Sequence, residues 1–241
     1  KLMTVPTPDG KLTPELIDTV AVRKGDEHHA QPKVVSITQT TELGTAYTVD
    51  EIAHIVERVH ANDWVLHVDG SRLSNAAATL GVSFKEMITD TGVDIVSFGG
   101  TKNGLMVGEA VLVINPDVVT GMKYLRKQSM QLASKMRFIS TQLEALLTDE
   151  LYLRNAGHAN AMAQRLAAAV HDIDGVSVPR PVQANAVFAV LPKVVSEKLM
   201  DDFHFYFWDE ALGEVRWMCS WDTTEKDVDE FAAAVRAAMS A

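Results

Sequence analysis

The sequence contains a single cysteine, Cys219, and no apolar run long enough to cross a membrane. One cysteine excludes an internal disulfide framework and fits a reducing compartment, so we expect a cytoplasmic protein. A membrane-spanning helix needs about 20 consecutive apolar residues, and the sequence predicts no such helix. Residues 1–10 lack the apolar core of a signal peptide, so none is predicted there.

Positive charge is also scarce, because 22 lysines and arginines face 32 aspartates and glutamates, for a formal net charge of −10. Such a surface repels phosphate backbones, so we do not expect a nucleic-acid partner. Apolar residues are abundant, at 47% of 241 positions, which is enough to bury a large core. This length suits one large domain or two smaller ones.

The first half of the sequence alternates helix and strand patterns. Helices are predicted at Thr13–Arg23, with Pro14 in the first turn, and at Thr48–Asn62, which opens on a capping box of Thr48 and Glu51. Strand patterns occupy residues 33–40, 64–70, 93–98 and 109–114, with a short helical segment at 84–88. Strands separated by helices predict parallel pairing in a sheet that is covered on both faces.

From Pro116 onward the pattern changes to long helices. One helical pattern runs from Pro116 to Leu147 and another from Tyr152 to Ile173, and the last helix begins near Thr224. Short strands are predicted at 186–191, 203–208 and 215–220. The sequence therefore predicts an α/β large domain over residues 1–150 and a C-terminal α+β small domain over residues 151–241, without an internal repeat.

Two of the predicted strands end in charged side chains. Asp69 closes the strand in WVLHVDGSR, with Arg72 three residues further on, and Lys102 follows the strand in VDIVSFGGTKNG. In open α/β sheets, ligands bind beyond the carboxyl ends of the strands. If the two strands lie close together in the sheet, Asp69 and Lys102 converge on one crevice.

A lysine and a carboxylate in this arrangement suit pyridoxal phosphate chemistry. The lysine holds the cofactor aldehyde as a Schiff base, and the carboxylate keeps the pyridine nitrogen protonated, so that the ring accepts electrons. Glycines beside Lys102 would admit the backbone close to the cofactor, and Thr101 offers a hydroxyl group for the phosphate.

The same residues also have structural interpretations. Asp69 could cap a turn or a helix, and the loop around Lys102 could be a solvated turn, since it lacks the Walker spacing of a phosphate loop. Arg72 could be a surface cation or the structural partner of an acid. Spacing alone does not decide between these interpretations.

The motifs themselves resemble those of a known family. HVDGSRLSNAA, followed by DIVSFGGTKNGLMVGEAVLV, resembles the low-specificity L-threonine aldolases, and the similarity continues through VVSITQTTELGTAYT, KYLRKQSMQLASKMRF, QANAVFAVLP and EVRWMCSWDTTEKDVDEF. The GGTKNG segment is similar to a bacterial branch that also includes phenylserine aldolases. The resemblance implies the pyridoxal phosphate-dependent aspartate aminotransferase fold (fold type I), with a mainly parallel sheet in the large domain.

The resemblance also implies a role for four residues. Lys102 matches the lysine that binds the cofactor, and Asp69 matches the aspartate paired with the pyridine nitrogen. Arg72 matches an arginine close to the cofactor and the substrate carboxylate, and Arg216 matches a second arginine that binds this carboxylate. A planar carboxylate suits bidentate guanidinium groups, although a strand arginine such as Arg216 could also be a simple ion-pair partner.

Three further residues have open roles. Lys127 matches a lysine near the active site of relatives, and Arg137 could approach the phosphate site of a neighbouring subunit, but both could also lie on the solvated face of a long helix. His67 shares a strand face with Asp69 and could support the site or pack in the core. Cys219 is expected to be a buried strand residue and not a nucleophile. The histidines lack ligand spacing, so no metal site is expected.

The sequence departs from the family pattern in two places. Many threonine aldolases carry a Thr-His-Asn segment where this chain reads QTTELG, so that Thr41 falls at or near the histidine position and its acid–base role cannot be transferred. The pattern also begins partway, because the glycine-rich phosphate turn and the histidine stacked on the pyridine are not found ahead of Thr13. We therefore expect a fragment or a processed chain of a longer enzyme.

The expected reaction is aldol cleavage of L-threonine or L-allo-threonine to glycine and acetaldehyde, with pyridoxal phosphate as cofactor. Lys127 or a water molecule could act as the base. The alternatives are phenylserine cleavage, transamination or β-elimination on the same fold, or an inactive fragment that only oligomerises. Besides binding an amino-acid substrate, the chain is expected to form a homodimer or homotetramer.

Overall fold

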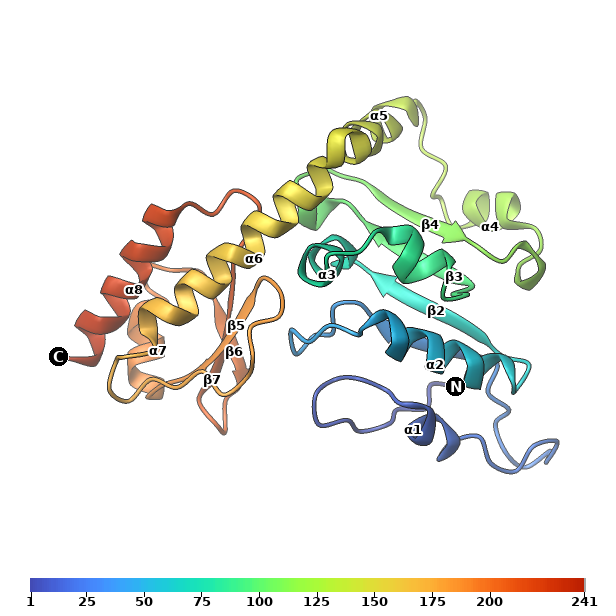
Figure 1. Cartoon of the computed structure of the whole chain (residues 1–241), viewed down its shortest axis with the longest axis horizontal. Coiled ribbons are helices and arrows are strands. Elements are labelled where there is room, and N and C mark those ends of the chain that lie inside the picture. The colour runs from blue at the N-terminus through green and yellow to red at the C-terminus, as the bar shows by residue number, and fades with distance from the viewer. Residues whose placement is uncertain (241) are drawn as a thin grey trace.

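A computed structural model describes residues 1–240 and contains two sheets joined by a long helix (Figure 1). Sheet A has the strand order β1 (Val34–Thr38), β2 (Val65–Gly70), β3 (Ile95–Gly99) and β4 (Glu109–Val113). Sheet B has the order β5 (Ala186–Val190), β7 (Glu214–Met218) and β6 (Tyr206–Asp209). The long helix α6 (Leu151–Val170) packs against helices on both sides of this division.

The remaining helices are short to medium in length. They are α1 (Pro14–Asp18), α2 (Val49–His60), α3 (Leu73–Leu80), α4 (Met122–Gln128), α5 (Arg137–Leu147), α7 (Lys193–Leu199) and α8 (Glu225–Met239). Single π or 3₁₀ turns lie at Lys85–Thr89, Thr101–Asn103, Pro116–Val118 and Thr148–Glu150. Within the described residues, no helix is long and apolar enough to span a membrane.

Sheet A is mainly parallel, as predicted. β1, β2 and β3 run parallel, with Asp69 of β2 opposite Ser97 of β3. β4 is antiparallel to β3, with Glu109 opposite Gly99, so the expectation of parallel pairing is wrong for this strand. Only residues 100–108 connect β3 to β4, and this connection is too short for the crossover that a parallel strand requires.

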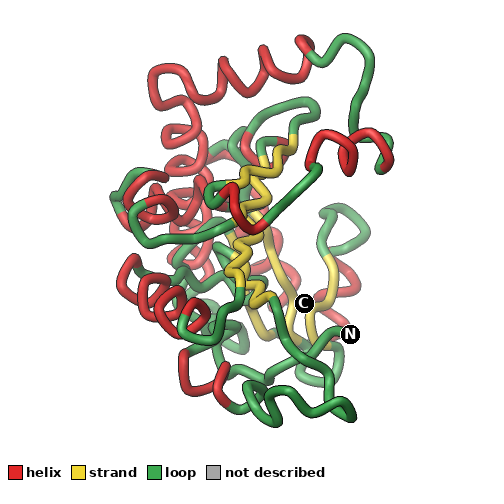
Figure 2. The backbone as a smooth tube through the Cα atoms, turned by 90° about the vertical axis from the view of Figure 1, so that its right-hand side faces the viewer, coloured by secondary structure: helices red, strands yellow, loops and turns green. Residues whose placement is uncertain are grey.

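One face of sheet A is covered by helices, and the other is not. Leu66 and Val68 of β2 are fully buried among residues of α2 and α3, while Val34 and Val111 are more than half exposed. The expectation of a sheet covered on both faces is therefore wrong for the described residues. β1, β2 and β3 follow one another in a single direction, so right-handed crossovers place both helices on the same face. Figure 2 shows most helices on one side of the strands.

Several predicted helix boundaries are confirmed by their caps. The Thr13 and Thr48 side chains accept hydrogen bonds at the starts of α1 and α2, and Thr48 and Glu51 form the predicted capping box. Thr224 caps α8 in the same way. α1 ends at Asp18, however, which is five residues earlier than the pattern predicted.

The predicted helix from Pro116 to Leu147 is broken. α4 ends at Gln128 and α5 begins at Arg137, and the intervening chain holds Met130 and Lys135 at φ of +56° and +58°. A helix cannot continue through such left-handed residues. α3 has no counterpart among the predicted helices; its N-cap position is Arg72, whose side chain makes no capping hydrogen bond.

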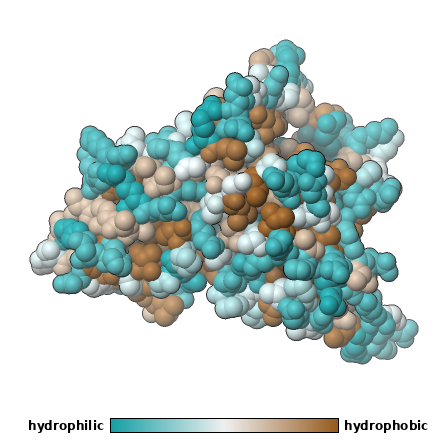
Figure 3. Space-filling view, viewed as in Figure 1, coloured by the Kyte–Doolittle hydropathy of each residue, from teal (hydrophilic) through white to brown (hydrophobic). Residues whose placement is uncertain are grey.

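The buried apolar residues form two clusters. The first surrounds sheet A and α2, and the second lies between sheet B and helices α6 and α8. Leu153 near the start of α6 packs against the first cluster, whereas Met162 and Leu166 belong to the second. Hydrophilic residues cover most of the face in Figure 3, with hydrophobic residues near its centre and over the C-terminal part. The domain boundary near residue 150 stays a prediction.

Candidate active site

Asp69 and Lys102 lie at the same edge of sheet A. β2 and β3 are parallel neighbours, so their carboxyl ends coincide. Asp69 is the penultimate residue of β2, and its Oδ1 accepts a hydrogen bond of 3.0 Å from the Ser71 backbone amide. Lys102 lies in the 3₁₀ turn that directly follows β3. The predicted convergence of these two strand ends is therefore present.

The turn that holds Lys102 depends on closely approaching glycines. A Cβ on Gly99 would lie 2.7 Å from Ser71 Cα, and one on Gly100 would lie 2.9 Å from the Gly108 carbonyl oxygen. Gly104 has φ of +109°, which disfavours residues with a side chain. The glycines are therefore required by close packing and backbone conformation, and the segment is more than a solvated turn.

Asn103 fixes the same turn to helix α6. Its side chain is buried, and its Nδ2 donates to the Tyr152 carbonyl of α6 at 3.0 Å. Asn155 Nδ2 donates to the Asn103 carbonyl at 2.9 Å. Lys102 itself is exposed, and no hydrogen bond or ion pair of its Nζ is found within residues 1–240. The turn thus presents a free amine on a fixed backbone.

Arg72 and Arg216 come together although 144 positions separate them in the sequence. Both bind Glu42: Arg72 Nη1 lies 3.4 Å from Glu42 Oε1, and Arg216 Nη1 lies 2.7 Å from Glu42 Oε2. The two arginine side chains are only 11% and 10% exposed, whereas Glu42 is 52% exposed. One carboxylate therefore bridges two nearly buried guanidinium groups.

Aromatic rings hold Arg216 from other sides. The guanidinium carbon lies 4.7 Å from the ring centroid of Trp208 and 5.1 Å from that of Tyr206. Arg216 Nη2 also donates to the Tyr206 hydroxyl oxygen. Tyr206 lies directly opposite Arg216 in sheet B, so neighbouring strands supply these contacts. Cation–π stacking of this kind orients an arginine without neutralising it.

Glu42 lies on the turn that follows β1, which is parallel to β2 and β3 in sheet A. Thr41 N donates to the Thr45 carbonyl at 2.9 Å, and Gly44 N donates to the Thr41 carbonyl at 3.0 Å. Gly44 has φ of +77°, and a Cβ there would lie 3.4 Å from Phe188 of sheet B. Ala46 N donates to Gln183 Oε1 at 2.9 Å, so this turn is fastened to the C-terminal part of the chain.

Sequence reasoning missed Glu42, although a signal was present. An acid four residues after the end of β1 obeys the same strand-end rule that identified Asp69 and Lys102. Thr41, which the resemblance places at or near the family's histidine, is buried and bonds Thr45 Oγ1 through its own hydroxyl at 2.7 Å. The exposed side chain of this turn is the glutamate.

The charges of the site act on one another. Burial raises the pKa of Glu42, but the hydrogen bond from Arg216 and the charges of Arg72, Arg216 and Lys102 outweigh it, so its pKa falls below the usual range. Burial and the charge of Arg216 lower the pKa of Arg72 more than Glu42 and Asp69 raise it, so the net shift is downward. Charge interactions therefore link Glu42, Arg72 and Arg216 to both Asp69 and Lys102.

Thr101 and His67 lie beside this group. Thr101 Oγ1 accepts a hydrogen bond of 3.2 Å from Gly108 N, which leaves its hydroxyl hydrogen available. His67 lies between two neighbouring strands, with Nδ1 2.8 Å from Ser36 Oγ and Nε2 2.9 Å from Ser97 Oγ. Desolvation lowers the pKa of His67, and the charge of Asp69 raises it by less. The net shift is downward, so a neutral ring is favoured.

Lys127 and Arg137 are not brought to the site within the described chain. Lys127 lies on α4, which follows the end of β4 remote from the carboxyl ends of β2 and β3 (Figure 1). Arg137 begins α5, and its guanidinium carbon lies 5.0 Å from the Phe138 ring centroid. Their predicted roles therefore stay predictions.

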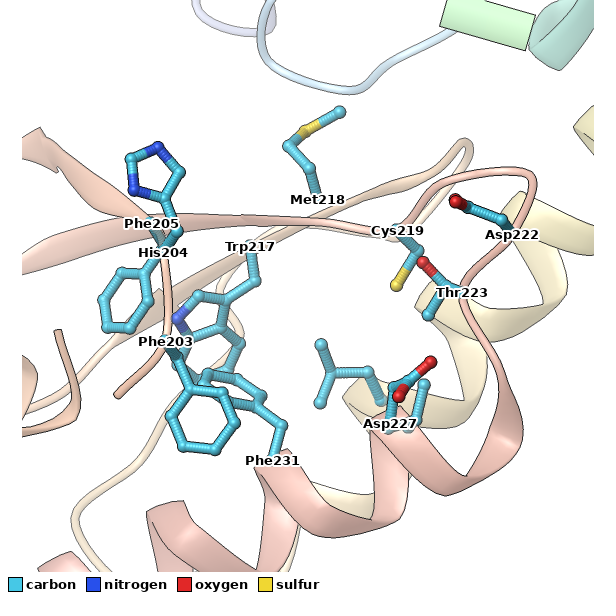
Figure 4. A pocket seen from close by; sticks show the side chains of 12 residues that line it. Phe203, His204, Phe205, Trp217, Met218, Cys219, Asp222, Thr223, Asp227 and Phe231 are labelled. Atoms are coloured by element: carbon cyan, nitrogen blue, oxygen red, sulfur yellow. The ribbon is translucent and has the colours of Figure 1, made fainter. Parts of the chain in front are cut away.

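A separate cavity of about 320 Å³ lies in the C-terminal part. Trp217 and the Cys219 thiol point into it, opposite Phe231 of α8 (Figure 4). Its lining, among the residues that the structure describes, includes neither lysine nor arginine. Burial raises the pKa of Cys219 to about 11, as befits the predicted buried and unreactive thiol.

Comparisons with known proteins agree on one family. A profile described as beta-eliminating lyase matches residues 1–193. Over all 241 residues, the chain is 45% identical to the low-specificity L-threonine aldolase of a Pseudomonas species and 44% identical to that of Pseudomonas aeruginosa, and it spans 70% of each. A solved threonine aldolase from Leishmania major superposes with a TM-score of 0.91 at 30% identity, over 99% of this chain and 70% of that one.

Proposed function

The chain belongs to the beta-eliminating lyase family, and from that premise we propose that it cleaves L-threonine and L-allo-threonine to glycine and acetaldehyde with pyridoxal phosphate. The fold is the type I fold of pyridoxal phosphate enzymes, as in the threonine aldolase of Leishmania major. The observation that carries the proposal is that Lys102 and Asp69 lie at the same edge of sheet A, and that Arg72, just beyond the end of β2, shares a carboxylate with Arg216 of sheet B.

The residues at this edge fit the cofactor. Lys102 offers an exposed amine for covalent attachment, and Asp69 offers a carboxylate on the adjacent strand for the pyridinium nitrogen. Thr101 retains a hydroxyl hydrogen that can be donated to the phosphate. Bound there, the cofactor supplies an electron-accepting ring that stabilises the electron pair left on Cα when the Cα–Cβ bond breaks.

The substrate carboxylate is assigned to Arg72 and Arg216. Two guanidinium groups that already share one carboxylate can bind another in the same position, and their near burial strengthens the interaction. Fixing the carboxylate orients Cα and the β-hydroxyl relative to Asp69 and Lys102. The cleavage removes the hydroxyl proton, breaks Cα–Cβ and returns a proton to Cα, so threonine yields glycine and acetaldehyde without a further reactant.

We also propose that the protein forms a homodimer or homotetramer. Large apolar side chains are exposed on α4, on α5, on the loop between them and on the β3–β4 connection, namely Tyr124, Leu125, Phe138, Met130 and Met106. Large apolar side chains that are exposed together favour a protein–protein contact. Such a contact would place Lys127 and Arg137, which lie in the same region, at a neighbouring subunit.

Acetaldehyde release tests the reaction directly. The purified chain is incubated with L-threonine and pyridoxal phosphate, and acetaldehyde is followed through NADH consumption by alcohol dehydrogenase. We expect acetaldehyde and glycine in equal amounts, loss of release in Lys102→Ala, and retention in Lys198→Ala, which alters an exposed lysine of α7. Absence of acetaldehyde from the unaltered chain, or full activity of Lys102→Ala, would contradict the proposal.

A further inference from the structure

Glu42 occupies the position that the proposed function assigns to the substrate. Its two carboxylate oxygens bind two different arginines, with Oε2 2.7 Å from Arg216 Nη1 and Oε1 3.4 Å from Arg72 Nη1. A free amino acid would offer the same planar group with the same charge. The two carboxylates cannot bind the arginine pair in this way at once.

Contacts other than Glu42 restrict both arginines. Arg216 is stacked against Trp208 and donates to the Tyr206 hydroxyl, so two neighbouring residues orient it independently of the carboxylate. Arg72 is the N-cap residue of α3, where the Asn75 and Ala76 amides donate to its backbone carbonyl. Both side chains are about 10% exposed, so surrounding atoms restrict them.

Glu42 is the member of the group that can leave. Its side chain is 52% exposed, although the turn beneath it is fixed by the hydrogen bonds of Thr41, Gly44 and Thr45. A change of side-chain rotamer alone therefore moves the carboxylate into water, without disturbing the backbone. The exchange replaces one carboxylate by another, so the buried guanidinium groups are not left without a negative partner.

We propose that Glu42 is a displaceable internal ligand, which fills the carboxylate position of the empty site and is exchanged for the carboxylate of the substrate. The inference rests on the proposed function, because it takes Arg72 and Arg216 as the groups that bind this carboxylate. Apparent substrate affinity is then reduced by the fraction of sites that Glu42 occupies. Glu42 thus stabilises the empty site and weakens substrate binding.

A role for Glu42 as the catalytic base fits the site less well. The surrounding positive charges of Arg72, Arg216 and Lys102 hold its pKa below the usual range despite burial. A carboxylate with a lowered pKa is a poor proton acceptor near neutral pH. The same charges keep Glu42 ionised, which is the form that competes with another carboxylate.

A ligand without an amine isolates this competition from the cofactor chemistry. The probe is 3-hydroxybutanoate, which has the carboxylate and β-hydroxyl of threonine but cannot react with the cofactor through an amine. Its dissociation constant is measured by calorimetry in the purified protein with pyridoxal phosphate present. We expect Glu42→Gln and Glu42→Ala to tighten binding about fivefold or more, because a charge-assisted contact no longer competes.

The kinetic expectation follows from the binding expectation. In Glu42→Gln the KM for L-threonine falls by a similar factor while kcat changes little, since the arginines keep their other contacts. Asp229→Asn is the matched control, because Asp229 forms a bidentate pair with Arg165 on the surface, at 3.1 and 2.8 Å. This control leaves both constants unchanged, and thermal unfolding confirms that all variants are folded.

Two results would overturn the inference. If Glu42→Gln and Glu42→Ala bind the probe as weakly as the unaltered protein or more weakly, Glu42 positions the arginines and does not compete. If Arg216→Ala binds the probe as well as the unaltered protein, the arginine pair is not the carboxylate site. Acetaldehyde release by the unaltered protein separates either result from a failure of the proposed reaction.

Discussion

Asn103 Nδ2 donates a hydrogen bond of 3.0 Å to the backbone carbonyl of Tyr152, which fastens the turn of Lys102 to the start of α6. The turn also receives a hydrogen bond from Asn155 of the same helix. The position of the Lys102 turn is therefore set by a helix that continues into the C-terminal part of the chain. Substitutions at this junction should change the position of Lys102 without replacing a residue that is proposed to bind substrate or cofactor.

Asn103→Ala should lower both activity and stability. Removing the amide deletes a hydrogen bond from a buried side chain to the partly buried Tyr152 carbonyl, at a cost of about 0.5–1.5 kcal/mol in the free energy of unfolding. A looser turn should also reduce kcat for acetaldehyde release more than it raises KM. Urea denaturation and steady-state kinetics measure the two effects, and unchanged kcat would show that the turn is positioned by its glycines alone.

Two glycine-to-alanine substitutions should have opposite effects on stability. An added Cβ on Gly100 would meet Leu105 and lie 2.9 Å from the Gly108 carbonyl oxygen, so Gly100→Ala should lose roughly 1–3 kcal/mol. Gly157 lies within α6 with no atom within 4 Å of an added Cβ, so Gly157→Ala should gain about 0.5–1 kcal/mol. Thermal unfolding compares the pair. Equal shifts in both variants would contradict the packing account of the turn.

Asp94 should make stability depend on acidic pH. Its carboxylate is buried and accepts hydrogen bonds from His60, Asn115 and the Leu66 amide at 2.8–2.9 Å. Burial raises the pKa of Asp94, but these hydrogen bonds outweigh it, so the net shift is downward from 3.8. A lowered folded pKa stabilises the protein above the unfolded pKa, and this contribution is lost as pH falls through the folded value.

Asp94→Asn should therefore unfold more easily at neutral pH, and its stability should fall less steeply than that of the unaltered protein below about pH 4. Urea denaturation across a series of pH values measures the difference, with exposed Asp201→Asn as the control. Parallel pH profiles for Asp94→Asn and the unaltered protein would contradict this account of the buried carboxylate.

Arg216→Lys should raise the KM for L-threonine by roughly tenfold or more, because an ammonium group cannot reproduce bidentate binding and the stacking on Trp208. The effect should fall mainly on KM, since the role proposed for Arg216 is to bind the carboxylate and not to act on the bond that breaks. Arg165→Lys, on the surface of α6, provides the control. An unchanged KM in Arg216→Lys would remove this residue from the site.

The sequence located Asp69 and Lys102 because their placement follows from local patterns. A strand is recognised in the sequence by its β-branched and apolar residues. The residues at its carboxyl end then lie at the edge of the sheet where ligands bind. The meeting of Arg72 with Arg216 depended on resemblance, since no spacing rule joins residues of two sheets. Glu42 was overlooked because its significance lies in its contacts, which long-range folding alone creates.

The errors in the fold have similar causes. The break between α4 and α5 depends on the left-handed conformations of Met130 and Lys135. No glycine or proline marks this break in the sequence. α3 contains Ser74 and Asn75, which are buried, and Asn75 Nδ2 donates to Asn160 Oδ1 of α6 at 2.9 Å. Tertiary contacts of this kind stabilise a helix that its own sequence pattern does not predict.

Borohydride trapping tests the central claim, that the turn after β3 presents the cofactor lysine. The chain is mixed with pyridoxal phosphate, reduced, digested and analysed by mass spectrometry, with Lys102→Ala as the matched control. We predict a pyridoxyl group on the peptide that contains Lys102, and its absence from the variant. A label confined to other lysines, or spread equally over the surface lysines of both proteins, would contradict the account.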